Sequence, residues 1–139
     1  MFHEWWFGVG AKCGFGALVI DLWLIDTSGP GAAAVAGFDA ELSPEERARG
    51  ARFRFQRDRE RYLLIHGAVR RILGEVAGVA PGLLRFRANA FGKPELVEGD
   101  VPFNLSRSGD WGLLAVSRDG PVGVDLECRT EVPEAEAVA

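Results

Sequence analysis

The chain has 139 residues, enough for one domain with a hydrophobic core of its own. Its composition, 47% hydrophobic and 26% charged residues, argues against a disordered chain and indicates a globular protein. The net charge of −4 argues against a general nucleic-acid-binding protein. Cys13 and Cys128 lack the spacing of metal ligands, so a reducing cytoplasm is the expected location.

Residues 1–16 predict an irregular extension of doubtful authenticity, which a start codon assigned too far upstream would explain. Charged residues and glycines interrupt the apolar N-terminal stretch before it reaches the roughly 20 residues of a membrane span. Neither a basic n-region nor a small-residue cleavage site marks a signal peptide. We therefore expect no membrane insertion.

The range Val19 to Ile25 is the first predicted strand, and a Gly/Ala-rich loop over 28–37 follows it. A helix start is predicted next. Ser43 suits the N-cap, Pro44 the first helical position, and Glu46 completes a capping box three residues after the cap.

From Asp58 onward, apolar residues recur at helical spacing and predict a long amphipathic helix that ends at Gly78 and Pro81. The apolar positions are Tyr62, Ile65, Val69, Ile72, Leu73 and Val76. Further strands are predicted over 83–87, 103–106, 113–117 and 122–127, with turns at 92–94 and 119–120.

Seven arginines lie between Arg47 and Arg61, and three interpretations of this cluster are open. The first is a solvated face, partly neutralised by the acidic residues among them. The second is a nucleic-acid surface, which the net charge disfavours. The third is a phosphate site, because guanidinium groups form paired hydrogen bonds with phosphate oxygens.

The segment Val122 to Glu127 is the most informative part of the chain. Side chains alternate faces on an extended strand, so Asp125 and Glu127 share one face, about 7 Å apart. Such a pair repels unless a cation lies between, and Mg²⁺ is typically held by one or two carboxylates, waters and substrate phosphates. The alternative is an edge strand whose outer face is merely acidic.

Two further motifs carry groups that suit phosphate. Gly92 permits close backbone approach, Pro94 stiffens the turn, and Lys93 between them supplies a point charge; the alternative is an ordinary surface turn. Asn104 and Ser106 share a strand face and can donate hydrogen bonds to phosphate or ribose oxygens. For Asn104 the alternative is a bond to its own backbone.

In this order, the motifs GKP, FNLS-x-SG and VGVDLE resemble the 4′-phosphopantetheinyl transferases of the surfactin-synthetase-activating (Sfp-like) class. The resemblance runs from about Ser43 to Arg129. It implies an α+β fold, one half of a pseudo-symmetric enzyme in which a small antiparallel sheet packs against a long helix. Residues 17–129 would form this N-terminal half, and 130–139 would begin the second.

The resemblance also implies a site. Arg49 and Lys93 match by position the basic residues that hold coenzyme A in the family, and Arg61 is a further candidate. The complete implied set for coenzyme A is Arg49, Arg61, Gly92, Lys93, Asn104, Ser106 and Arg107, and the implied Mg²⁺ ligands are Asp125 and Glu127.

One position departs from the family pattern inside the second motif. Arg107 stands where the family has a histidine that contacts the coenzyme A phosphate. A guanidinium keeps the charge for this contact but cannot titrate in a useful range. His66 lies beside the apolar stripe of the long helix, where a packing role is favoured over a catalytic one.

The family's third motif, W-x-x-K-E-[AS], does not occur in the sequence, so a catalytic glutamate and lysine cannot be assigned. One hypothesis is a transferase that is cut short or completed by another polypeptide and modifies a serine of an acyl- or peptidyl-carrier protein. The other is a non-catalytic remnant that at best binds coenzyme A; self-association could rebuild a cleft without restoring the missing glutamate. A plain α+β interaction domain with an accidental motif match is a third, weaker interpretation.

Overall fold

The computed structural model describes residues 11–15, 18–29 and 32–127, and there it confirms the α+β class. The main antiparallel sheet has the strand order β1 (Ala11–Phe15), β2 (Leu18–Asp26), β6 (Trp111–Ser117) and β5 (Phe103–Ser108). A second sheet pairs β3 (Phe86–Ala88) with β4 (Pro94–Leu96). The helical elements are α1 (Ala32–Ala36), α2 (Pro44–Ala51), α3 (Gln56–Ala77) and the 3₁₀ turn η1 (Pro81–Leu83).

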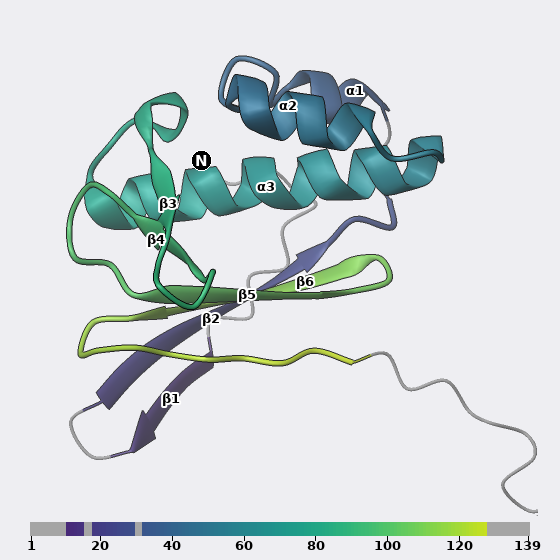
Figure 1. The fold of residues 1–139 in the computed structure, drawn as a ribbon. Helices are drawn as coiled ribbons and strands as arrows, with labels where there is room; N and C mark the ends of the chain where they lie inside the picture. Colours follow the sequence, from purple (N-terminus) through teal and green to yellow (C-terminus); the bar gives the residue numbers. More distant parts are fainter. Residues whose placement is uncertain (1–10, 16–17, 30–31, 128–139) are drawn as a thin grey trace, which may run out of the picture.

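Helix α3 is the middle layer, with the main sheet on one side and α1 and α2 on the other (Figure 1). Its sheet-facing core contains Ile65, Ala68, Val69, Ile72 and Leu73 from the helix, and Ile25, Phe103, Leu114 and Val116 from the strands. On the opposite side, Leu64 packs with Phe38 and Leu42. At Gly67 the helix makes room for the Phe38 ring, because a Cβ there would lie 2.4 Å from it. Both long faces of α3 are therefore buried.

The predicted start of helix α2 and the predicted end of helix α3 are both confirmed. Ser43 Oγ accepts the Glu46 amide at 3.1 Å, and Glu46 Oε1 accepts the Ser43 amide at 2.9 Å, which completes the capping box of α2. Helix α3 ends at Gly78, whose φ of 69° is the left-handed conformation that favours glycine at this position.

Several predicted boundaries were wrong. Residues 11–15, expected in an irregular extension, form β1 and pair with β2. The loop predicted over 28–37 contains the short helix α1. The strand predicted over 83–87 begins only at Phe86, because the proline-led turn η1 extends to Leu83 and residues 84–85 are irregular. Val76, expected on the buried stripe of α3, is 45% exposed because it lies in the last turn.

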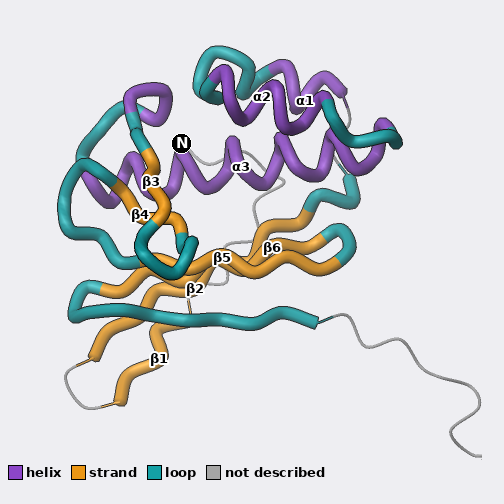
Figure 2. The backbone as a smooth tube through the Cα atoms, in the orientation of Figure 1, coloured by secondary structure: helices purple, strands orange, loops and turns teal. Residues whose placement is uncertain are grey.

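Figure 2 shows one long loop, residues 118–127, that runs beside β5 after the last strand. Residues 1–10 and 128–139, which include Cys128 and the predicted start of a second half, lie outside the described residues. Within the described ranges, none of the helices has the length and apolarity needed to cross a bilayer.

Candidate functional site

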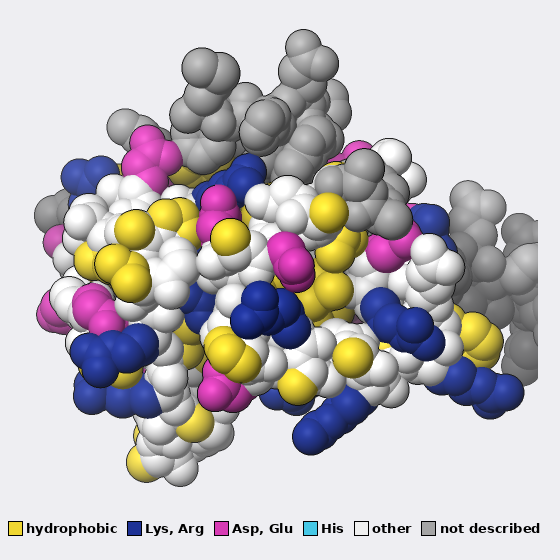
Figure 3. All heavy atoms as spheres, turned by 90° about the horizontal axis from the view of Figure 1, so that it is seen from above, with side chains coloured by type: hydrophobic (Ala, Val, Ile, Leu, Met, Phe, Trp, Pro, Cys, Tyr) yellow, Lys and Arg dark blue, Asp and Glu magenta, His cyan; other side chains and the backbone are white. Residues whose placement is uncertain are grey.

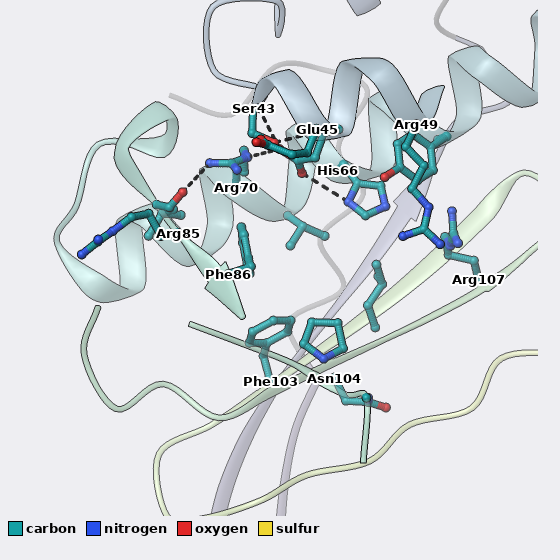
Figure 4. A pocket seen from close by; sticks show the side chains of 17 residues that line it. Ser43, Glu45, Arg49, His66, Arg70, Arg85, Phe86, Phe103, Asn104 and Arg107 are labelled. Carbon is teal, nitrogen blue, oxygen red and sulfur yellow. Dashed lines mark hydrogen bonds and ion pairs between the residues drawn. The ribbon is translucent and has the colours of Figure 1, made fainter. Parts of the chain in front are cut away.

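A cavity of about 750 Å³ lies between the helices α2 and α3 on one side and β3, β5 and the 92–94 turn on the other (Figure 4). This volume is in the range of small-molecule sites, roughly 300–1,000 Å³. The predicted residues that line it are Arg49, Gly92, Asn104 and Arg107, which come from three different parts of the fold. The structure thus brings four of the seven predicted coenzyme A residues to one cavity.

The wall of this cavity also contains an ion-pair network that the sequence did not predict. Glu46 Oε1 lies 2.5 Å from Arg70 Nε, and Glu46 Oε2 lies 3.4 Å from His66 Nδ1. The Arg70 guanidinium is almost fully buried and donates to the carbonyls of Pro81 and Leu84, at 2.8 and 2.9 Å. This network joins α2, α3 and η1 behind the cavity.

Burial alone would raise the pKa of Glu46. Hydrogen bonds from His66, from the Ser43 amide and from Arg70, together with the charge of Arg70, outweigh burial and lower this pKa from 4.5 to about 2. Glu46 is therefore a structural carboxylate that stays ionised at neutral pH, and it is poorly suited to act as a general base.

Two aromatic rings form the floor beside this network. The rings of Tyr62 and His66 lie 4.1 Å apart, and the Arg107 guanidinium lies 5.5 Å from the Tyr62 ring. Burial raises the pKa of Tyr62, so its hydroxyl stays protonated at neutral pH. The buried His66 Nε2 has no hydrogen-bond partner among the described residues. Tyr62 and His66 were expected to pack within the helix, and they also line the cavity.

A second cavity of about 550 Å³ lies next to the first and shares Tyr62, Leu105 and Arg107 with it. Two predicted residues that do not line the first cavity, Arg61 and Ser106, line this second one. Arg61 is already engaged with acidic groups, because its guanidinium lies 2.6 Å from Asp110 and 3.3 Å from Asp58.

Except for Arg61, the arginines of the 47–61 cluster are all exposed, as the solvated-face interpretation predicts. On the face seen in Figure 3, basic side chains are interspersed with acidic and apolar ones rather than gathered in one patch. Only Arg49 among these exposed arginines lines the first cavity.

The 92–94 turn is organised by Asn89. Its side-chain oxygen accepts the amides of Phe91 and Lys93, each at 2.9 Å, and Gly92 takes a φ of 78°. Lys93 Nζ donates to the carbonyl of Val122 at 2.6 Å. The predicted lysine is thus directed at the segment that bears Asp125 and Glu127.

Residues 122–127 were predicted as a strand, and this prediction was wrong. The segment is extended but has no backbone ladder in the structure, because the side chains of Asn104 and Ser106 lie between it and β5. The predicted alternation of faces is nevertheless present. Asp125 and Glu127 are exposed, whereas Val124 and Leu126 are half-buried.

The two acidic residues do not line the first cavity. Asp125 Oδ1 lies 3.5 Å from Ser106 Oγ, which places it next to β5. No group of three or more His, Cys, Asp or Glu side chains within the described residues is arranged to hold a metal ion. Two exposed carboxylates on one face still fit the ligand set of Mg²⁺, which usually keeps several waters and binds substrate phosphates.

Comparison with known proteins agrees with the motif resemblance. The chain is 36% identical over 124 residues to the 4′-phosphopantetheinyl transferase HetI of Nostoc sp., covering 86% of this chain and 52% of that protein. It is 42% identical over 89 residues to the 4′-phosphopantetheinyl transferase psf-1 of Bacillus pumilus, covering 62% and 37% respectively. A Synechocystis sp. protein provisionally assigned the same activity is 36% identical over 115 residues, covering 81% and 46%.

The chain belongs to the 4′-phosphopantetheinyl transferase superfamily. No family model matches it. The chain spans about half the length of HetI and of the Synechocystis protein. The described fold, a small antiparallel sheet against the long helix α3, is the one expected for half of a phosphopantetheinyl transferase.

Proposed function

We propose that residues 17–129 are the half of a 4′-phosphopantetheinyl transferase that binds coenzyme A and presents the metal-binding carboxylates. The reaction would transfer the phosphopantetheine arm to a serine of an acyl- or peptidyl-carrier protein, with Mg²⁺. The observation that carries this proposal is the convergence of Arg49, Gly92, Asn104 and Arg107 on one cavity.

In this reaction the serine oxygen attacks the β-phosphate of coenzyme A, and 3′,5′-adenosine bisphosphate leaves. Arg49 and Arg107 lie at the same side of the cavity (Figure 4), where two guanidinium groups would hold phosphate oxygens and neutralise their charge. Asp125 and Glu127 would hold the Mg²⁺, which supplies further charge neutralisation to the pyrophosphate.

The serine must lose a proton, and no carboxylate of the described site is free to accept it. Glu46 is committed to Arg70, and Asp125 and Glu127 are assigned to the metal. We propose that the base belongs to the second half of the enzyme, either further residues of the same protein or another polypeptide.

The alternative function is a non-catalytic half that binds coenzyme A only. This second candidate is favoured by the position of Asp125 and Glu127, whose exposed carboxylates lie outside the first cavity.

Calorimetric titration with coenzyme A tests the binding proposal. Arg49→Gln should weaken binding about tenfold, because it removes a charged hydrogen bond. Arg54→Gln is the matched control: Arg54 is exposed on the same part of the chain and does not line the cavity. Equal affinity of both variants and the wild type would contradict the proposed site.

Mass spectrometry of an apo carrier protein, incubated with coenzyme A and Mg²⁺, separates the two candidates. We expect no phosphopantetheine adduct with this chain alone. Adduct formation on addition of a polypeptide that carries the W-x-x-K-E motif would support the divided enzyme, and its failure would favour the non-catalytic half. Robust modification by the chain alone would contradict the assignment of the base to the second half.

A further inference from the structure

The segment that bears Asp125 and Glu127 is held by side chains from two other parts of the fold. Lys93 Nζ donates to the Val122 carbonyl at 2.6 Å. Further along, the Val124 amide donates to Asn104 Oδ1 and the Leu126 amide donates to Ser106 Oγ, each at 2.9 Å. These contacts replace the backbone ladder that a neighbouring strand would provide.

The spacing of these contacts matches the period of an extended chain. Asn104 and Ser106 are two residues apart on β5, and the amides that they accept are also two residues apart. The segment therefore runs parallel to β5. Its two hydrogen bonds to β5 side chains restrict the rotation of the segment about its own axis. The same arrangement leaves Asp125 and Glu127 exposed while Val124 and Leu126 are half-buried.

We propose that Lys93, Asn104 and Ser106 form a clamp whose role is to position the carboxylates of Asp125 and Glu127. They are thus positioning residues for these two carboxylates, and Asn104 also lines the first cavity. The three contacts of the clamp can be tested whether or not the proposed function is correct, but their consequence for metal binding rests on the proposed function.

The burial of the clamp supports this role. Lys93, Asn104 and Ser106 are all half-buried, and each holds a backbone group that would otherwise lack a partner among the described residues. A half-buried amide or carbonyl without a partner is unfavourable, so each contact restricts the positions available to the segment. Ser106 Oγ additionally lies 3.5 Å from Asp125 Oδ1 and can orient this carboxylate directly.

Amide hydrogen exchange measured by NMR tests the clamp without any ligand. Asn104→Leu and Ser106→Ala should increase the exchange rates of the Val124 and Leu126 amides respectively, by about tenfold, because each change removes one acceptor. Exchange of the Leu114 amide in the sheet core should stay the same, which shows that the variants are folded. Ser106→Thr keeps a hydroxyl oxygen and should restore the slow exchange of Leu126.

Two titrations then separate positioning from direct ligand contact. Ser106→Ala should weaken Mn²⁺ binding, measured by electron paramagnetic resonance, about tenfold, as loss of a residue that orients a metal ligand typically does. Its affinity for coenzyme A without metal should equal that of the wild type. Arg107→Gln is the contrasting control, with weaker coenzyme A binding and unchanged exchange of Leu126.

Unchanged exchange of Val124 and Leu126 in the two variants would overturn the clamp, as would a metal-free loss of coenzyme A affinity in Ser106→Ala. If the wild type binds no Mn²⁺, the metal assignment of the proposed function fails, and the exchange rates still decide whether the clamp exists.

Discussion

Replacement of Glu46 by glutamine tests the ion-pair network behind the cavity. Glutamine keeps the size of the side chain and an oxygen that can accept the Ser43 amide, but it loses the charge that pairs with Arg70. The fall in the pKa of Glu46 from 4.5 to about 2 corresponds to roughly 3 kcal/mol of folding free energy at neutral pH. Arg70 is 3% exposed, so its unpaired cation cannot recover this loss by hydration.

The loss should depend on pH in a defined direction. The pKa of Glu46 is lower in the folded than in the unfolded protein. The ionised side chain therefore stabilises the fold fully only at pH values above about 4.5. This effect disappears as the pH falls toward about 2, where the wild-type side chain is itself protonated. The difference in stability between Glu46→Gln and the wild type should therefore close over this range.

Urea denaturation, followed by circular dichroism at neutral pH and at several acidic values, measures this difference. Glu45→Gln is the matched control, since Glu45 is the exposed neighbour on the same turn of α2 and should change stability little. A Glu46→Gln variant that is as stable as Glu45→Gln at neutral pH, or one whose deficit stays constant down to the lowest pH, would refute the electrostatic explanation.

Two other changes test the packing and the surface electrostatics. Gly67→Ala should destabilise the fold by about 1–3 kcal/mol in urea denaturation, because the new Cβ would meet the Phe38 ring at 2.4 Å. Gly29→Ala, where a Cβ would meet nothing within 4 Å, is its control, and equal stability of the two would contradict the close packing. Asp110→Asn removes ion pairs at 2.6 and 2.7 Å to two arginines of α3 and should cost at most about 1 kcal/mol. That cost should shrink in high salt, and a salt-independent cost would mean that the ion pairs are not its source.

The elements that the sequence predicted well have local signals. The capping box at Ser43 and the left-handed glycine at the end of α3 each depend on residues within one helical turn. The buried stripe of α3 depends on a repeat of 3.6 residues, which survives in any tertiary context. The face toward Phe38 was not predicted, because the partner comes from a loop whose fold has no periodic signal.

The parts of the site that sequence missed depend on distant partners. Glu46 and Arg70 are 24 positions apart, and nothing in their local sequence marks them as a pair. The alternation over 122–127 correctly indicated which side chains are exposed, but it carries no information about whether a neighbouring backbone completes a ladder. Contacts of coenzyme A with Arg49 and Arg107 stay predictions that the titrations above decide.

The burial of α3 on two opposite faces limits how this protein can vary during evolution. One inserted or deleted residue rotates the rest of an α-helix by about 100°, since each turn contains 3.6 residues. In most surface helices a neighbouring layer can shift to absorb such a rotation. Here the sheet-facing core and the Phe38 contact would be misaligned together, so length changes among homologues should be confined to the connecting loops.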